Sequence, residues 1–197
     1  MLTAMISKRQ FLKTILVTGL SMTYGVCRAK GVTMAKPKIL VVYFSWSGST
    51  KEAAERIHSI LGGEIARIET VVALPNDYEA VVKVHKAQTA AQEHPALKPL
   101  GVNVSDYDVI CLGHSIWSGK LPMPVRSFLD KADLKGKTLL HFACHGGSGL
   151  GQSQKELSDL LPETKLLPGL ALYGWGGLRD ADRIQPWLER LGFLPER

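Results

Sequence analysis

The 197-residue sequence has few cysteines and lacks the common motifs that hold zinc or a nucleotide. Its three cysteines, Cys27, Cys111 and Cys144, are too few and too far apart for a disulfide framework, and no Cys-x-x-Cys pair offers a zinc site. Gly-x-x-x-x-Gly-Lys-[Ser/Thr] does not occur, and no Gly-x-Gly-x-x-Gly follows the first predicted strand. These absences exclude a disulfide-stapled domain and a zinc module, and they argue against a P-loop hydrolase or a dinucleotide-binding domain.

Acidic residues are absent from residues 1–29, which contain Lys8, Arg9, Lys13 and Arg28. The moderately apolar run over residues 14–26 is too short for a membrane-spanning helix, which needs roughly 20 apolar residues. A basic start, a short apolar stretch and small residues before the first strand are the parts of a cleavable export signal. We therefore predict an export signal over residues 1–29 and a short linker over residues 30–36.

The segment Ser7-Lys8-Arg9-Gln10-Phe11-Leu12-Lys13 resembles the twin-arginine export consensus, with Lys in place of the first Arg. The resemblance implies recognition by the export machinery, a periplasmic or exported location, and no stable membrane insertion after the signal is removed. Translation from Met34, directly before the first predicted strand, would instead give a cytoplasmic protein.

The net charge of +6 first suggests an anionic partner such as nucleic acid. Four of the 24 basic residues lie in residues 1–29, so the rest of the chain carries 20 basic and 18 acidic residues. Most of the basicity thus belongs to the export signal, and no nucleic-acid partner is expected.

Apolar strand patterns alternate with helical patterns over residues 37–194. The predicted strands are 39–44, 65–68, 108–113, 138–144 and 166–173, and the predicted helices are 50–61, 77–92, 125–129, 152–161 and 180–191. Continuous apolar runs are typical of parallel strands that are buried on both faces. This alternation predicts one doubly wound α/β domain over residues 37–197, with five parallel strands and helices on both faces.

Three polar loops follow the first, third and fourth predicted strands, at the edge where open parallel sheets bind ligands. The first offers hydroxyls and a helix start for a phosphate, the second an indole as a wall for a flat ring, and the third glycines that let the backbone approach a ligand. These loops are Ser45-Trp46-Ser47-Gly48-Ser49-Thr50, Ser115-Ile116-Trp117-Ser118-Gly119 and Cys144-His145-Gly146-Gly147-Ser148-Gly149.

Together the three loops resemble the flavodoxin family, and the third is similar to that of a short-chain flavodoxin-like subgroup. The resemblance implies strand order 2-1-3-4-5 and flavin mononucleotide (FMN) as the cofactor. Its phosphate would lie in the first loop and its ring between the other two. Ser115 and Ser118 stand where the subgroup has proline and tryptophan, which leaves the outer face of the ring more open.

The resemblance also implies a role for each loop. Trp117 would stack on the ring or meet its edge, the Ser118-Gly119 backbone would lie beside the flavin N5, and His145 would hydrogen-bond the ring or gate solvent. The phosphate would receive hydrogen bonds from Ser45, Ser47, Ser49, Thr50 and the Gly48 backbone, and the pyrimidine end of the ring from the N–H groups of residues 146–149.

Three functions remain open at this point. An exported electron carrier would exchange electrons with a redox partner protein, whereas an FMN-dependent reductase would act on quinones or other small aromatic acceptors. A cofactor-free binding module is the third. A serine hydrolase is disfavoured because Trp117 breaks the Gly-x-Ser-x-Gly elbow that Gly113-His114-Ser115 would begin. No catalytic or metal-binding residue is assigned. Cys111 and Cys144 are expected to be buried thiols, with a disulfide as the alternative.

Overall fold

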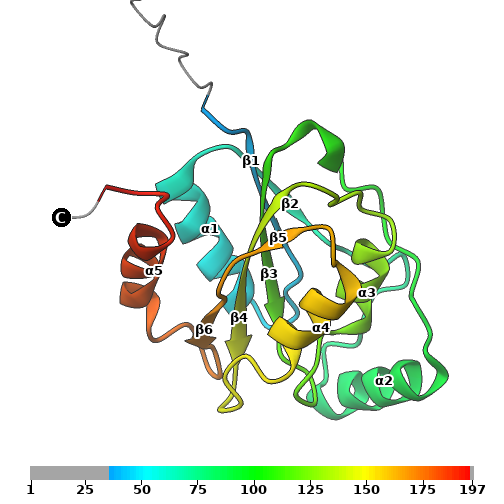
Figure 1. Ribbon diagram of the computed structural model, residues 1–197. Coiled ribbons are helices and arrows are strands. Elements are labelled where there is room, and N and C mark those ends of the chain that lie inside the picture. The colour runs from blue at the N-terminus through cyan, green and yellow to red at the C-terminus, as the bar shows by residue number, and fades with distance from the viewer. Residues whose placement is uncertain (1–35, 196–197) are drawn as a thin grey trace, which may run out of the picture. The chain divides into compact units, whose positions relative to one another are not determined.

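The computed structural model describes residues 36–195, which form alternating strands and helices (Figure 1). The strands are β1 (Ile39–Tyr43), β2 (Glu64–Arg67), β3 (Val109–Ser115), β4 (Thr138–His145), β5 (Lys165–Leu166) and β6 (Leu170–Tyr173). The helices are α1 (Ser49–Leu61), α2 (Tyr78–Ala91), α3 (Met123–Leu129), α4 (Ser153–Leu160) and α5 (Ile184–Arg190), with 3-10 turns η1 (Val104–Asp106) and η2 (Ala181–Arg183). The predicted export signal and all of the predicted linker except Lys36 lie outside the described residues.

All strand pairs are parallel, and the order along the sheet is β2-β1-β3-β4-β5, with β6 also paired to β4. This confirms the predicted doubly wound α/β fold and its order 2-1-3-4-5. The arrowheads of β3 and β4 in Figure 1 point toward the end of the domain where α2 lies. The carboxyl ends of the strands, and the loops that follow them, therefore gather at that end.

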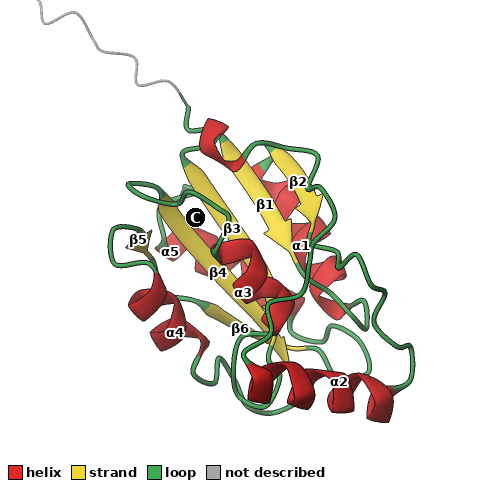
Figure 2. Ribbon diagram, turned by 90° about the vertical axis from the view of Figure 1, so that its right-hand side faces the viewer, coloured by secondary structure: helices red, strands yellow, loops and turns green. Residues whose placement is uncertain are grey.

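Helices cover both faces of the sheet, because alternate residues of each strand point to opposite sides. Val41 and Tyr43 pack in one apolar cluster with residues of α1 and α5. Leu40 and Val42 pack in a second cluster with residues of α3 and α4. Figure 2 shows the sheet between these helices, with α2 across its lower end. The prediction of helices on both faces is confirmed.

The single fifth strand predicted over residues 166–173 is divided in the structure. Leu139 of β4 pairs with Leu166, and Phe142 pairs with Leu170, so the edge carries one residue more than β4 between these pairs. Pro168 has no N–H to donate, and the Gly169 N–H donates to Gln154 Oε1 (2.9 Å) instead of to β4. The result is a bulge that a periodicity argument does not detect.

The predicted last helix also begins later than expected. Asp180 does not cap it; its carboxylate accepts the Tyr173 N–H (2.6 Å) and an Arg183 N–H (3.1 Å). Asp77, by contrast, caps α2, with Oδ1 accepting the Ala80 N–H (2.8 Å). Within residues 36–195, no helix has both the length and the apolar character needed to cross a membrane.

Two histidines lie completely buried on adjacent strands beneath α4. The rings of His114 in β3 and His141 in β4 stack with centroids 5.6 Å apart, and His114 Nε2 lies 3.3 Å from His141 Nδ1. His141 Nε2 hydrogen-bonds Gln154 Oε1 (2.7 Å) in α4. Burial lowers the pKa of His114 to about 3, and it also lowers the pKa of His141, so both rings are neutral at pH 7.

This burial predicts that the domain loses stability in mild acid. A histidine whose folded pKa lies below its unfolded pKa stabilises the fold fully above the unfolded value, near 6.5, and loses that contribution as the pH falls. We expect the free energy of unfolding to fall by about 1.4 kcal/mol per pH unit for His114 alone between pH 6.5 and 5. Urea unfolding across that range should show a shallower slope for His114→Gln than for the wild type. The partly exposed His58→Gln is the control, and equal slopes in all three proteins would contradict the assignment.

Candidate functional site

A cavity of about 1150 Å³ opens at the carboxyl edge of the sheet. It is bordered by the loops after β1, β3, β4 and β6 and by one face of α2. The lining residues from the predicted loops are Trp46, Ser47, Ser49, Ser115, Ile116, Trp117, Ser118, Gly119, Cys144, His145, Gly146, Gly147 and Ser148. The structure thus brings together most of the residues that the sequence singled out, from three separate loops.

A smaller cavity of about 430 Å³ lies at the start of α1, where the first N–H groups of a helix have no intrahelical partner. Ser47, Gly48, Ser49 and Glu52 line one side of it. Gly48 precedes the helix with φ +101°, and no side chain caps the first turn. Free N–H groups and the positive end of a helix dipole form a suitable site for an anion. Ser47 and Ser49 line both cavities, so the two adjoin.

Three hydroxyls expected to bind phosphate instead hold the loops together. Ser49 Oγ donates to the carbonyl of Gly174 (2.6 Å), and Ser45 Oγ accepts the Gly48 N–H (3.2 Å). Thr50 Oγ1 shares a hydrogen bond with Ser115 Oγ (3.3 Å). Ser45 and Thr50 do not line either cavity, whereas Ser47 is exposed and lines both.

A two-residue turn follows β3 and borders the large cavity. Trp117 and Lys120 exchange two backbone hydrogen bonds (3.1 and 3.0 Å), and both residues between them have positive φ, 51° at Ser118 and 77° at Gly119. This is the pattern of a type I′ turn. The Gly119 carbonyl accepts the Gln152 N–H (2.7 Å), which holds the peptide that follows Gly119.

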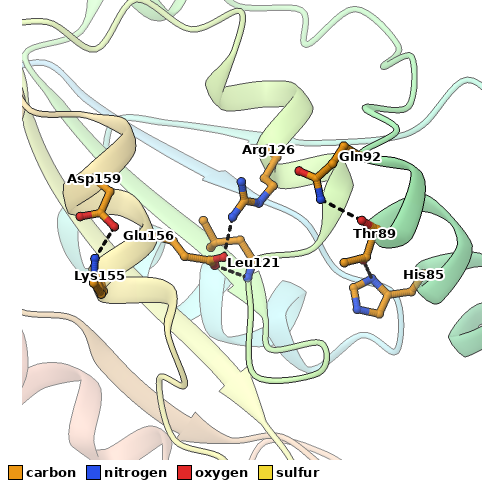
Figure 3. Close-up of polar contacts among 8 residues, drawn as sticks. All are labelled: His85, Thr89, Gln92, Leu121, Arg126, Lys155, Glu156 and Asp159. Carbon is orange, nitrogen blue, oxygen red and sulfur yellow. Dashed lines mark hydrogen bonds and ion pairs between the residues drawn. The ribbon is translucent and has the colours of Figure 1, made fainter.

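An ion pair from α4 anchors the other end of this turn (Figure 3). Glu156 accepts the Leu121 N–H (2.8 Å) and pairs with Arg126 of α3 (2.5 Å). Both side chains of the pair are mostly buried, so water screens their interaction only weakly. The segment 117–121 is therefore fixed to the helices of one face as well as to β3.

Helix α2 supplies a wall of the cavity that was not among the predicted site residues: Tyr78, Val81, Val82 and His85 line it. His85 is buried, its ring meets the Trp117 ring edge to face with centroids 5.2 Å apart, and its Nδ1 hydrogen-bonds Thr89 Oγ1 (3.3 Å; Figure 3). Burial lowers the pKa of His85, although a hydrogen bond with the Trp117 backbone opposes this. The helical spacing of these four residues was visible in the sequence, but their proximity to the edge of the sheet was not.

The loop after β4 presents a second neutral histidine. His145 Nδ1 accepts the Gly147 N–H (2.9 Å), so the proton of the neutral ring lies on Nε2. Burial lowers the pKa of His145, which keeps the ring uncharged at pH 7. The Gly147 N–H was expected to bind the ring of the ligand. Because it donates to His145 instead, it is not free to do so. Gly149 does not line the cavity.

A fourth loop, residues 174–177, was missed. Tyr173, Gly174, Trp175 and Gly176 line the large cavity, and Gly176 and Gly177 line the small one. Open parallel sheets bind ligands beyond the carboxyl ends of their strands, and this glycine-rich segment follows the last parallel strand. The sequence therefore offered the same signal for this loop as for the other three. Trp175 meets Tyr78 edge to face (5.3 Å), and Tyr78 lies 6.3 Å from Trp46. We call these three residues the aromatic rim.

The alternative of a disulfide between Cys111 and Cys144 is excluded by the sheet register. Cys144 pairs with Ser115, four residues beyond Cys111 along β3, which separates the two Cα atoms by roughly 13 Å. Both cysteines are buried free thiols, as expected. Burial raises the pKa of Cys144 to about 11. Within the described part of the chain, no group of three or more His, Cys, Asp or Glu side chains could hold a metal ion.

Known proteins match both the sequence and the fold. A family model described as flavodoxin matches residues 38–191. A candidate flavoprotein from Bacteroides eggerthii is 30% identical, with a TM-score of 0.68, and the match covers 80% of this chain and 99% of that one. A candidate flavoprotein from Bacteroides uniformis is 26% identical, with a TM-score of 0.67 and coverage of 78% and 98%. A flavoprotein from Lactobacillus acidophilus, solved in complex with FMN, has a TM-score of 0.63 with coverage of 77% and 99%; at 22% identity it shows the shared fold alone.

The turn geometry predicts opposite effects for two neighbouring substitutions. Ser118 has a φ that disfavours residues with a Cβ, so Ser118→Gly should raise the free energy of unfolding by up to about 1 kcal/mol. Gly119→Ala should lower it by about 1–2 kcal/mol for the same reason. Chemical denaturation measures both changes. Destabilisation of equal size by the two substitutions would show that the turn is not of type I′.

Proposed function

This chain belongs to the flavodoxin family, and we propose that it is an exported electron-transfer protein that binds FMN at the carboxyl edge of its sheet. The observation that carries the proposal is the pair of adjoining cavities. The small one lies at a helix start that suits an anion, and the large one has aromatic walls that suit a flat ring. FMN has a phosphate at one end and a planar ring at the other. The FMN-bound neighbour from L. acidophilus supports the proposal as a protein of the same fold.

The residues of the site have distinct tasks in this proposal. Bound FMN would supply reversible one- and two-electron chemistry. The N–H groups at the start of α1 would bind its phosphate, and Trp117, backed by His85, would form a wall for its ring. Since the Gly119 carbonyl is held by Gln152, the peptide between Ser118 and Gly119 is the part of the turn that can reorient. His145 offers a neutral N–H donor at Nε2.

A reductase of small aromatic acceptors is the second candidate. The large cavity exceeds the range of about 300–1,000 Å³ typical of single-ligand pockets, and the aromatic rim offers further flat surfaces. Photoreduction of the FMN-loaded protein separates the two functions. Reduction in two resolved one-electron steps supports the carrier, and a single two-electron step supports the reductase.

The FMN site is tested by two matched glycine substitutions at opposite ends of α1. Gly48 and Gly62 both have positive φ, and a Cβ on either would meet no atom within 4 Å, so alanine acts only through backbone conformation. Each substitution should cost about 1 kcal/mol of stability. Gly48→Ala should also raise the Kd for FMN about tenfold or more, because it turns the N–H groups away from the phosphate.

Quenching of FMN fluorescence measures the Kd, and Gly62→Ala should leave it unchanged. Absence of FMN binding by the wild type would contradict the proposal and favour a cofactor-free binding module. Equal effects of the two substitutions on the Kd would contradict the position of the phosphate.

The proposed export is supported by the composition of residues 1–29 and is tested separately. In a bacterial host with a twin-arginine pathway, we expect a processed protein in the periplasm. Arg9→Gln should leave it unprocessed in the cytoplasm, whereas Lys36→Gln, outside the predicted signal, should be exported. Cell fractionation and intact mass measure both results. A wild-type protein that stays in the cytoplasm and begins at Met34 would contradict export.

A further inference from the structure

Arg179 lies beside the junction of the two cavities. Its N–H donates to the Tyr173 carbonyl (3.1 Å) and closes the loop 174–178. Its guanidinium lies over the Tyr173 ring, 5.1 Å from the centroid, and Nη2 is 3.8 Å from the position that a Cβ on Gly176 would occupy. Tyr173 lines the large cavity and Gly176 lines both. The charged end of Arg179 is thus held next to the place where the two cavities meet.

The other charged groups nearby are already paired. Glu52, which lines the small cavity, pairs with Arg56 (2.9 Å), and Lys51 of the same helix turn lies 3.7 Å from Glu55. Asp180, next to Arg179 in the chain, pairs with Arg183 (3.1 Å). Arg179 itself has no ion-pair partner among residues 36–195.

The donors of the phosphate loop leave a phosphate short of positive charge. Ser49 Oγ donates to the Gly174 carbonyl, and Ser45 and Thr50 line neither cavity, so Ser47 and the start of α1 supply neutral donors only. A guanidinium matches the geometry of phosphate oxygens and forms strong charge-assisted hydrogen bonds with them. Stacking on Tyr173 also restricts the Arg179 side chain before any ligand binds.

We propose that Arg179 is a specificity-determining residue that pairs with the terminal phosphate of the flavin and makes the site prefer FMN to riboflavin. The inference rests on the proposed FMN site and adds to it a residue outside the three loops found in the sequence. It also gives a role to the loop 174–178, which Arg179 closes and whose Gly176 lies next to the guanidinium.

The test compares two flavins that differ only in the phosphate. Quenching of flavin fluorescence gives the Kd for FMN and for riboflavin with the wild type, Arg179→Gln and Arg179→Lys. The control is Arg190→Gln, which removes an equal charge at an exposed position of α5. Arg179→Gln should raise the Kd for FMN about tenfold and leave that for riboflavin unchanged. The Kd of Arg179→Lys for FMN should lie between those of the wild type and Arg179→Gln. The difference in Kd between the wild type and Arg179→Gln should be smaller at high salt.

Each other result has a separate meaning. Equal weakening of both flavins by Arg179→Gln would place the guanidinium at the ring and overturn the inference. If Arg179→Gln leaves the ratio of the Kd values for FMN and riboflavin unchanged, the inference is overturned as well. In that case FMN binding by the wild type still supports the proposed function. Failure of the wild type to bind FMN would overturn the proposed function and, with it, the inference. Circular dichroism of each variant verifies that a loss of affinity is not a loss of fold.

Discussion

The parallel register of β1, β3 and β4 is the constraint on which the site depends. Tyr43 pairs with Gly113, and Ser115 pairs with Cys144, so the three loops begin at nearly the same level of the sheet. Backbone hydrogen bonds continue this alignment past the strand ends, from the Ile116 N–H to the Cys144 carbonyl (3.0 Å) and from the Gly174 N–H to the His145 carbonyl (2.9 Å). Parallel pairing therefore places polar segments from distant parts of the sequence around one cavity.

The polar groups at this edge divide into those that build the site and those left for a ligand. Ser49 connects the first loop to the loop after β6, and Thr50 connects it to the end of β3. Glu156 of α4 anchors the turn after β3 by accepting the Leu121 N–H. Buried polar groups that are all hydrogen-bonded rigidify a structure. The groups that remain are the start of α1, Nε2 of the neutral His145 ring and the guanidinium of Arg179. Together they suit a ligand with one anionic end and one flat, weakly polar end.

Local patterns in the sequence were sufficient for the order of strands and helices and for three of the four loops, because burial on both faces and helical periodicity are visible in single segments. The bulge between β5 and β6 was not visible, since it arises from the Gln154 side chain, which takes a hydrogen bond that β4 would otherwise receive. The position of α2 over the cavity was equally hidden. Its face of Tyr78, Val81, Val82 and His85 is apolar in the way a core helix is, and only the tertiary fold shows that this face lines a cavity.

The most direct measurement of the central claim is a crystal structure of the protein grown with FMN. We expect the phosphate within hydrogen-bond distance of the N–H groups at the start of α1. The ring should lie between the turn 117–120 and the loop after β4, and no strand should leave the sheet. A flavin bound elsewhere, or with its phosphate away from α1, would contradict the account.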